Sequence, residues 1–229
     1  MKKLVIIPAY NERDSIVRTV NDIKEYAADF DYIVINDCST DDTRKLCEEN
    51  HFPCLSLPVN LGIGGAVQSG YLYGIRNGYD VAVQFDGDGQ HSAKYLNPML
   101  ETLQEQNADM VIGSRFITNE GFQSSFLRRI GIHHFSLLIR ILTGKKITDP
   151  TSGMRMVNRD VMETFAVDYP KDYPEPESVV HVLAQKKRVV EIPVRMNERS
   201  DGVSSISARK SVYYMIKVTI AMLIARIRG

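Results

Sequence analysis

The sequence has no excess of charge of either sign, because 28 Lys and Arg balance 28 Asp and Glu over 229 residues. Proteins that bind nucleic acid usually carry a basic excess, so a generally basic nucleic-acid protein is excluded. The three cysteines show no CxxC spacing, which indicates neither a disulfide framework nor a zinc site and agrees with a reducing cytosol. Apolar residues make up 44% of the chain, which is enough for a core and too much for a disordered protein.

Long hydrophobic runs are also missing. The N-terminal apolar run ends at Pro8 after four residues, so we expect no targeting segment there. The longest weakly charged stretch, residues 212–225, has 14 residues and is interrupted by Lys217. A helix needs about 20 apolar residues to span a bilayer, so the sequence predicts no crossing of the membrane.

The balanced total charge hides an uneven distribution along the chain. Residues 121–148 and residues 202–229 each contain five Lys or Arg and no acid. Removing these ten bases leaves 18 bases against 28 acids in the remainder. The sequence therefore describes an acidic body that carries two basic segments.

Short β-branched runs alternate with helical patterns through the first half of the chain. The predicted strands cover residues 4–7, 32–35, 54–57, 81–85 and 110–112, and the predicted helices cover 14–28, 41–50, 65–77 and 93–106. This alternation predicts an α/β fold with a parallel sheet covered on both faces, and ligands bind beyond the carboxyl ends of such strands. The Pro-rich residues 169–177 are predicted to form a loop before a last strand at 189–194 and a closing helix.

Acidic residues follow three of the predicted strands. Asp86 and Asp88 come after the fourth strand, and each is followed by a glycine. Two such carboxylates suit Mg²⁺ or Mn²⁺, with an anionic ligand completing the coordination shell. The alternative is a simple Asp-Gly turn. Glu12 follows the first strand and Asp37 the second, where each could bind a ribose or base or only cap a helix.

Two further segments at the same edge are candidates for contacts with phosphate. The glycine-rich residues 60–65 match neither a P-loop nor GxGxxG, so we expect them to let a helix start close to a ligand or to the sheet. Arg115 follows the fifth strand, where it is either a phosphate partner or an ordinary surface arginine.

Taken in order, these segments resemble a family 2 glycosyltransferase with a GT-A fold, most closely the polyprenyl-phosphate sugar synthases of the dolichol-phosphate mannosyltransferase-like branch. The resemblance covers about residues 3–207 and rests on IIPAYNE, NDCSTDDT, NLGIGGAVQSGY, FDGDGQH, IGSRF, TDPTSGMR and ERSDGVSSIS. It implies a nucleotide-diphospho-sugar transferase domain over residues 1–207, with a mostly parallel sheet between two helical layers. Residues 208–229 lie beyond the resemblance, and their own apolar pattern with basic ends predicts an amphipathic interface helix.

The resemblance also assigns roles to individual residues. Asp86 and Asp88 match the DxD pair that holds Mg²⁺ or Mn²⁺ on the pyrophosphate of a sugar nucleotide, and Gln90 can join the metal shell. Arg199 matches a position on the mobile loop that closes over the donor. The positions assigned to the nucleotide and its phosphates are Pro8, Ala9, Tyr10, Glu12, Asp37, Arg115, Arg155 and Arg199.

Two departures from the family pattern bear on the donor and on the membrane. Relatives of the mannosyltransferase branch usually have a Lys after the Ser of the late loop, where this chain has Ser204, Ser205 and Ile206. We therefore predict UDP-N-acetylglucosamine or UDP-glucose as the donor, with GDP-mannose as the second candidate. The long transmembrane tail of many relatives is also absent from this sequence.

The acceptor decides which residues the reaction needs. Family 2 enzymes invert the anomeric centre by direct displacement, and a hydroxyl acceptor would need a general base, for which Glu175 or Glu177 stands in the matching segment. A lipid phosphate is already an anion, so Glu177 would then only order the site. Asp149 either orients a substrate or belongs to a helix-ending Asp-Pro turn.

The predicted reaction is transfer of a sugar to a polyprenyl phosphate, such as undecaprenyl phosphate, for modification of cell-envelope polysaccharide. Two alternatives stay open. One is a hydroxyl-acceptor transferase that extends a lipid-linked saccharide. The other is a non-catalytic binder of sugar nucleotides, or a scaffold for a membrane partner.

The two basic segments predict a peripheral protein at the cytoplasmic face of the membrane. Residues 126–142 place Ile130, His134, Leu137, Leu138 and Ile141 on one helical face, with arginines off or beside it. Basic amphipathic helices lie on membrane surfaces, where each Lys or Arg contributes about 1 kcal/mol near anionic lipid. For the closing helix, the alternatives are a homo-oligomer and a small membrane-protein partner, and both helices could also be ordinary core helices.

Overall fold

The computed structural model of the chain describes residues 1–118, 126–197 and 208–228. Its strands form one sheet with the order β3-β2-β1-β4-β6-β5-β7, in which only β6 runs antiparallel to its neighbours. The strands are β1 (Lys3–Ala9), β2 (Asp31–Asn36), β3 (Cys54–Ser56), β4 (Val81–Gln84), β5 (Met110–Ser114), β6 (Arg155–Asn158) and β7 (Val189–Pro193). The α/β fold with a mostly parallel sheet is therefore confirmed.

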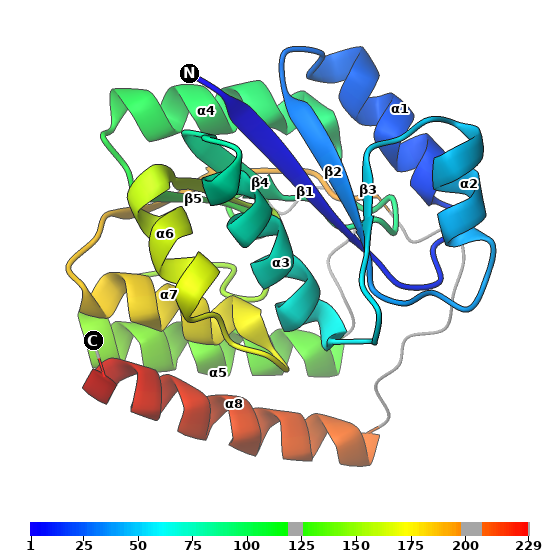
Figure 1. Ribbon diagram of the computed structural model, residues 1–229. Helices are drawn as coiled ribbons and strands as arrows, with labels where there is room; N and C mark the ends of the chain where they lie inside the picture. Colours follow the sequence, from blue (N-terminus) through cyan, green and yellow to red (C-terminus); the bar gives the residue numbers. More distant parts are fainter. Residues whose placement is uncertain (119–125, 198–207, 229) are drawn as a thin grey trace.

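Helices cover both faces of this sheet (Figure 1). Successive residues of a strand point to opposite faces, so Leu4 and Ile6 of β1 join one core cluster while Val5 and Ile7 join the other. The first cluster packs under α3, α5, α6, α7 and α8, and the second under α1, α2 and α4. The helices are α1 (Ile16–Tyr26), α2 (Thr43–Glu49), α3 (Gly62–Arg76), α4 (Leu96–Glu105), α5 (Phe126–Thr143), α6 (Arg159–Val167), α7 (Pro174–Ala184) and α8 (Ala208–Arg228).

The second half of the chain differs from the expectation at two places. The short strand β6 lies between β4 and β5 and is followed directly by α6, and neither element was predicted. The expectation of a loop over residues 169–177 was wrong, because α7 begins at Pro174. The first turn of a helix makes no use of its backbone N–H groups inside the helix, so it tolerates proline.

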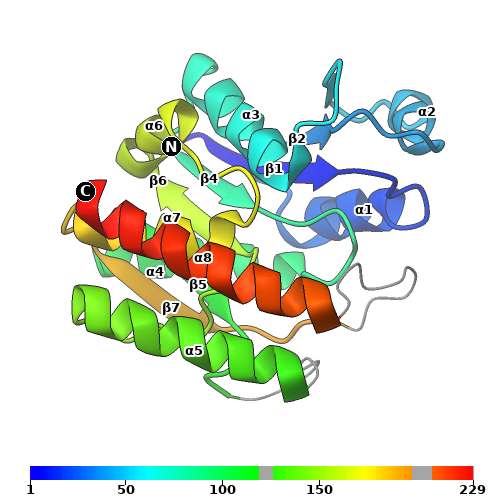
Figure 2. The same ribbon diagram turned by 90° about the horizontal axis from the view of Figure 1, so that it is seen from below.

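Helices α5 and α8 lie side by side and run parallel to each other (Figure 2). The imidazole Nε2 of His134 lies 3.0 Å from the hydroxyl Oγ1 of Thr219, within hydrogen-bonding distance. The Arg226 guanidinium donates to the Leu142 carbonyl at 2.8 Å. The inner side of α8 is part of the core, where Met222 is fully buried. Among the described residues we find no helix with the length and hydrophobicity needed to cross a bilayer.

Candidate functional site

A cleft of about 320 Å³ opens at the carboxyl ends of β1 and β2, beside the start of α3. This is the edge at which parallel strands present their following turns, as the sequence predicted. Five of the residues assigned to the nucleotide or its phosphates meet here. The residues that line the cleft are Pro8, Ala9, Tyr10, Glu12, Asp37, Asn60, Gly62, Ile63 and Ala66.

Asp37 ties the turn after β2 to the start of α3. Its backbone N–H donates to the Ala9 carbonyl at 2.9 Å, and its carboxylate Oδ1 accepts the Leu61 N–H at 2.7 Å. The Asn60 amide donates to the Asp37 carbonyl at 3.2 Å. Asp37 is therefore held in the lining of the cleft by its backbone, which binds the end of β1, and by its carboxylate, which binds the residue before α3.

The glycine-rich start of α3 packs tightly against a distant loop. The Gly64 N–H donates to the Lys171 carbonyl at 3.1 Å, and a Cβ on Gly64 would lie 2.1 Å from the Pro170 carbonyl oxygen. Only a glycine allows this approach. The sequence predicted a close approach of this segment to a ligand or to the sheet. Gly64 instead approaches the loop of residues 170–171, and Gly62 lines the cleft.

Glu12 is fixed where β1 gives way to α1. Its backbone N–H donates to the Thr43 hydroxyl at 2.8 Å, and its carboxylate Oε2 accepts the Ser15 hydroxyl at 2.8 Å. Tyr10, two residues earlier, leaves its ring about half exposed beside the cleft. The turn thus presents an aromatic face next to a held carboxylate.

The acidic turn after β4 adjoins this cleft. A Cβ on Gly87 would lie 3.0 Å from the Pro8 carbonyl oxygen and 3.6 Å from Cγ of Glu12, so the turn passes directly beside the β1 turn. Asp86 Oδ1 accepts the Gln84 amide at 3.1 Å, and Asp88 Oδ1 accepts the Gln90 N–H at 3.0 Å. Both carboxylates are half-buried.

The acidic turn, residues 86–90, fits a divalent cation that is bound partly by carboxylates of the protein and partly by a phosphate of the ligand. A Cβ at position 153 would lie 2.4 Å from Asp86 Oδ2, so glycine there leaves the room that this carboxylate occupies. Among the described residues no three His, Cys, Asp or Glu side chains converge as a metal site. Mg²⁺ is commonly bound through one or two carboxylates plus substrate phosphates, and Asp86 and Asp88 suit that arrangement.

Arg115 is a buried residue, so its interpretation as a surface arginine was wrong. Its guanidinium binds Asp149 through two bonds, Nε to Oδ2 and Nη2 to Oδ1, each of 2.7 Å. The Asp149 side chain is fully buried, and Thr151 also contacts Arg115 Nη2 at 2.9 Å. Asp149 therefore holds the arginine in a fixed orientation and does not present an open carboxylate.

Arg155 is buried and is not among the residues that line the cleft. Its guanidinium donates to the carbonyls of Pro150 and Ser152 at 2.7 Å each and to the Ser178 hydroxyl at 2.7 Å, and it also reaches the Glu175 carbonyl. The structure thus ties the loop before β6 to α7 through this side chain. Arg199 lies outside the described residues.

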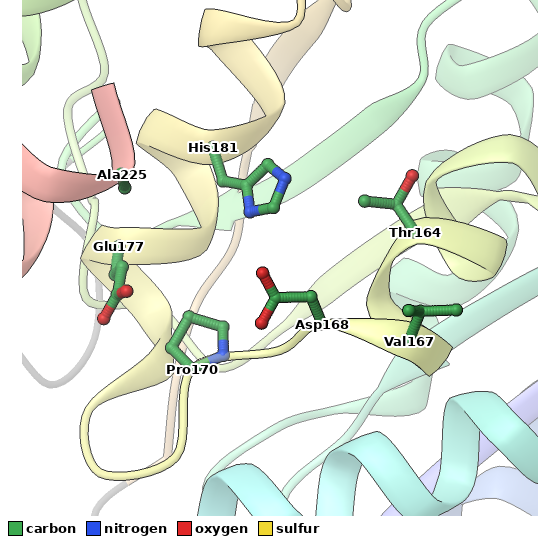
Figure 3. Close-up of a pocket in the computed structure, with 7 residues that line it drawn as sticks. All are labelled: Thr164, Val167, Asp168, Pro170, Glu177, His181 and Ala225. Carbon is green, nitrogen blue, oxygen red and sulfur yellow. The ribbon is translucent and has the colours of Figure 1, made fainter. Parts of the chain in front are cut away.

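Glu177 lines a second cavity, of about 300 Å³, between α6, α7 and α8. Figure 3 shows Glu177 and His181 on α7, with Asp168 across the cavity from them. Among the residues that line the cleft beside α3 there is no residue of α7. The structure therefore does not bring Glu177 together with Glu12, Asp37 and the acidic turn.

Comparison with known proteins now identifies the family. The family model described as "Glycosyl transferase family 2" matches residues 4–165. The chain belongs to glycosyl transferase family 2.

Three curated relatives of this family 2 glycosyltransferase are named for transfer to polyprenyl or dolichyl phosphates. An undecaprenyl-phosphate mannosyltransferase of Micrococcus luteus is 31% identical over 238 residues, covering 100% of this chain and 97% of that protein. A polyprenol monophosphomannose synthase of Mycolicibacterium smegmatis is 30% identical, over 95% of this chain and 85% of that protein. A UDP-N-acetylglucosamine–dolichyl-phosphate N-acetylglucosaminyltransferase of Methanococcus voltae is 26% identical, over 83% and 84%.

Solved structures confirm the GT-A fold of this glycosyltransferase. Glucosyl-3-phosphoglycerate synthase from Mycobacterium tuberculosis, in complex with UDP, superposes with a TM-score of 0.72 at 17% identity. The match covers 98% of this chain and 80% of that one. The same enzyme in complex with Mn²⁺, UDP and its product gives a TM-score of 0.70 at 19% identity.

The sequence did not lead us to three polar residues of the glycosyltransferase, Tyr169, Gln84 and Glu191, which hold Asp86 or the loop of Asp149 by hydrogen bonds. Tyr169 donates its hydroxyl to Gln84 Oε1 at 3.4 Å, and Gln84 in turn donates to Asp86. Burial raises the pKa of Tyr169 well above its ordinary value, so it stays protonated as a donor. Glu191 anchors the loop that carries Asp149. Gln84 and Glu191 each interrupt an apolar strand, and a polar residue at such a position could have indicated a buried hydrogen bond.

Proposed function

We propose that this glycosyltransferase moves a sugar from a nucleotide-sugar donor to a polyprenyl phosphate at the cytoplasmic face of the membrane. The observation that carries the proposal is the contact between the cleft and the acidic turn, through Gly87 against Pro8 and Glu12. A nucleoside in the cleft would place its diphosphate beside Asp86 and Asp88. Such a site binds a donor and a divalent cation together.

Each part of the site has a chemical task in this reaction. Tyr10 and Asp37 would bind the nucleoside, one by its ring and one by its carboxylate. Asp86 and Asp88 would hold Mg²⁺ or Mn²⁺, and Gln90 follows them in the same turn. The cation would supply positive charge for the leaving nucleoside diphosphate, and the Arg115 guanidinium would add to it.

The choice of a phosphate acceptor is supported by the relatives' names and by the position of Glu177. A polyprenyl phosphate is an anionic nucleophile at neutral pH, so its attack on the anomeric carbon needs no general base. Glu177 lines the cavity beside α8 and not the cleft. We expect Glu177→Gln to retain turnover, whereas abolished turnover at unchanged stability would favour the hydroxyl-acceptor alternative.

The outer sides of α5 and α8 form the surface that we assign to the membrane. On α8 the exposed apolar residues recur at helical spacing, and α5 adds Ile130, Leu137 and Ile141. Arg129, Arg140 and the adjoining Lys145 and Lys146 are also exposed. The exposed apolar residues of α8 are Tyr213, Ile216, Ile220, Leu223, Ile224 and Ile227. A basic rim around an apolar stripe is complementary to an anionic bilayer.

The donor needs a direct screen. The sequence favours UDP-N-acetylglucosamine or UDP-glucose, while two relatives of at least 30% identity are named for mannose transfer. We would incubate the protein and undecaprenyl phosphate with radiolabelled UDP-N-acetylglucosamine, UDP-glucose or GDP-mannose, in the presence of Mg²⁺ or Mn²⁺. Transfer of label into the lipid phase is the expected result, and it identifies sugar and nucleotide together.

The matched control for the screen is Asp88→Asn, which removes one negative charge from the acidic turn and changes little in volume. Turnover should fall by at least ~10²-fold, the size typical of losing one electrostatic contact to a transition state. EDTA should stop the wild-type reaction. If no donor labels the lipid, the non-catalytic binder or scaffold becomes the better interpretation. If the wild type is active and Asp88→Asn is equally active, the role assigned to Asp88 is refuted.

A further inference from the structure

Glu191 is an acid within the apolar strand β7 that the proposed function leaves without a role. Its carboxylate accepts three hydrogen bonds from one loop: Oε2 from the Thr148 N–H at 2.7 Å and hydroxyl at 3.0 Å, and Oε1 from the Asp149 N–H at 2.8 Å. Burial raises the pKa of Glu191, while these three bonds act in the opposite direction. Bonds to a charged acceptor are the stronger ones, so the carboxylate fixes this backbone firmly.

The backbone that Glu191 fixes carries the carboxylate that orients Arg115. Asp149 engages the guanidinium through both oxygens, and its Oδ2 also accepts the Arg115 backbone N–H at 3.2 Å. The bidentate pair has a demanding geometry, because two parallel bonds set the plane of the guanidinium. A shift of the Asp149 backbone would therefore rotate Arg115.

The other end of the same loop is fixed by a second buried charge. Arg155 donates to the carbonyls of Pro150 and Ser152, the residues that follow Asp149. Gly153 comes next and lies against Asp86 Oδ2. Glu191 therefore binds N–H groups at the start of the loop, and Arg155 binds carbonyls at its end. The loop between them contacts Arg115 through Asp149 and Asp86 through Gly153.

We propose that Glu191 is a positioning residue of this glycosyltransferase, which orients Arg115 through the backbone of residues 148–149 and the Asp149 carboxylate. Glu191 itself touches no part of the cleft. The consequence for donor binding rests on the proposed function, in which Arg115 faces the donor phosphates. The orientation of Arg115 is a property of the protein alone and can be measured without substrate.

The first test follows the Arg115 Nε–H proton by ¹⁵N NMR, with the signal assigned by its loss in Arg115→Lys. Glu191→Gln keeps the shape of the side chain but replaces one acceptor oxygen by an NH₂ group that faces an N–H donor. We expect the Arg115 signal to shift and its exchange with water to speed up about tenfold, as for loss of one charge-assisted bond. Glu163→Gln, at an exposed acid paired with Arg159, is the matched control and should change neither.

The second test is a double-mutant cycle with the donor found in the screen. Glu191→Gln should raise the donor KM about tenfold with a smaller change in kcat, and should add little in the Arg115→Lys background. If Glu191→Gln does not fold, Thr148→Val removes one of the three bonds to Glu191 and should give a smaller change of the same kind. Because the Thr148 hydroxyl also bonds the Ser114 hydroxyl at 2.6 Å, Ser114→Ala is its control.

The outcomes separate the two proposals. An unchanged Arg115 signal in the folded variant, or equal effects of Glu191→Gln with and without Arg115, would overturn the positioning role. A wild type that turns over no donor would refute the proposed function. The NMR experiment would still decide the role of Glu191.

Discussion

The outer face of α8 offers the sharpest test of membrane association, because its apolar side chains are exposed without supporting the core. Ile216 and Ile220 lie one turn apart and are 58% and 51% exposed. Fully burying an isoleucine side chain is worth about 1.5–3 kcal/mol, so the exposed half of each would contribute about 1 kcal/mol on entering the bilayer interface. The double variant Ile216→Gln/Ile220→Gln should thus lose about 2 kcal/mol of membrane affinity, which is roughly 30-fold.

The assay is cosedimentation with vesicles that contain anionic phosphatidylglycerol, compared with vesicles of phosphatidylcholine alone. Exposed positions change the free energy of unfolding by only about 0.5 kcal/mol each, so the melting temperature should stay nearly constant. Tyr26→Gln, on the opposite face of the sheet at the end of α1, is the control for loss of an exposed apolar residue. Deleting α8 would be a poorer test, because Met222 belongs to the core.

The result that refutes this reasoning is specific. If the double variant sediments with anionic vesicles as the wild type does, the outer face of α8 does not bind the bilayer. If neither protein binds vesicles while the wild type forms a dimer that the double substitution breaks, the stripe is an interface between two copies. Binding that does not weaken with added salt would remove the contribution of the basic rim, since exposed charges are screened.

Three further predictions concern single side chains. A hydrogen bond with the Cys47 thiol lowers the pKa of Cys54 to about 7, so the rate at which iodoacetamide alkylates Cys54 should rise through about pH 7. Cys47→Ala should move the midpoint of that rise to higher pH, and equal midpoints would contradict this. Gly64→Ala should lower the free energy of unfolding by roughly 1–3 kcal/mol in urea titrations, because its Cβ would collide with the residue 170 carbonyl, whereas a gain from helix propensity would contradict it. Tyr169→Phe should lower the free energy of unfolding by about 0.5–1.5 kcal/mol, because it loses the bond to Gln84. Tyr71→Phe should not lower it measurably, because the Tyr71 hydroxyl has no hydrogen-bond partner among the described residues, and equal losses for the two variants would refute this difference.

Local patterns in the sequence were enough to predict the sheet and the position of the cleft. The first five strands appear within a few residues of their predicted places, because continuous apolar runs and the turns that follow them are local signals. The parallel order then forced Glu12, Asp37 and the acidic turn to one edge. The strand β6 escaped prediction because it is only four residues long and begins with Arg155, a charge that tertiary contacts bury.

The partners of Arg115, Asp149 and Glu191 could not be predicted, because each pair joins positions far apart in the chain. Arg115 and Asp149 are 34 residues apart, and Asp149 and Glu191 are 42 apart. A sequence shows that an arginine follows a strand, but not whether a carboxylate will meet it there. The same limit applies to Glu177, whose helix faces the cavity beside α8.

By itself, the sequence determined the α/β class, the family and the edge of the sheet that holds the site, because periodicity and turn chemistry act over a few residues. Only the tertiary structure decided which charges serve the cleft and which hold the protein together. It turned Arg155 inward, paired Asp149 with Arg115, and laid α8 along α5 with one side in the core and the other in solvent. The physical reason is that a buried charge must find a partner, and packing between distant segments selects that partner.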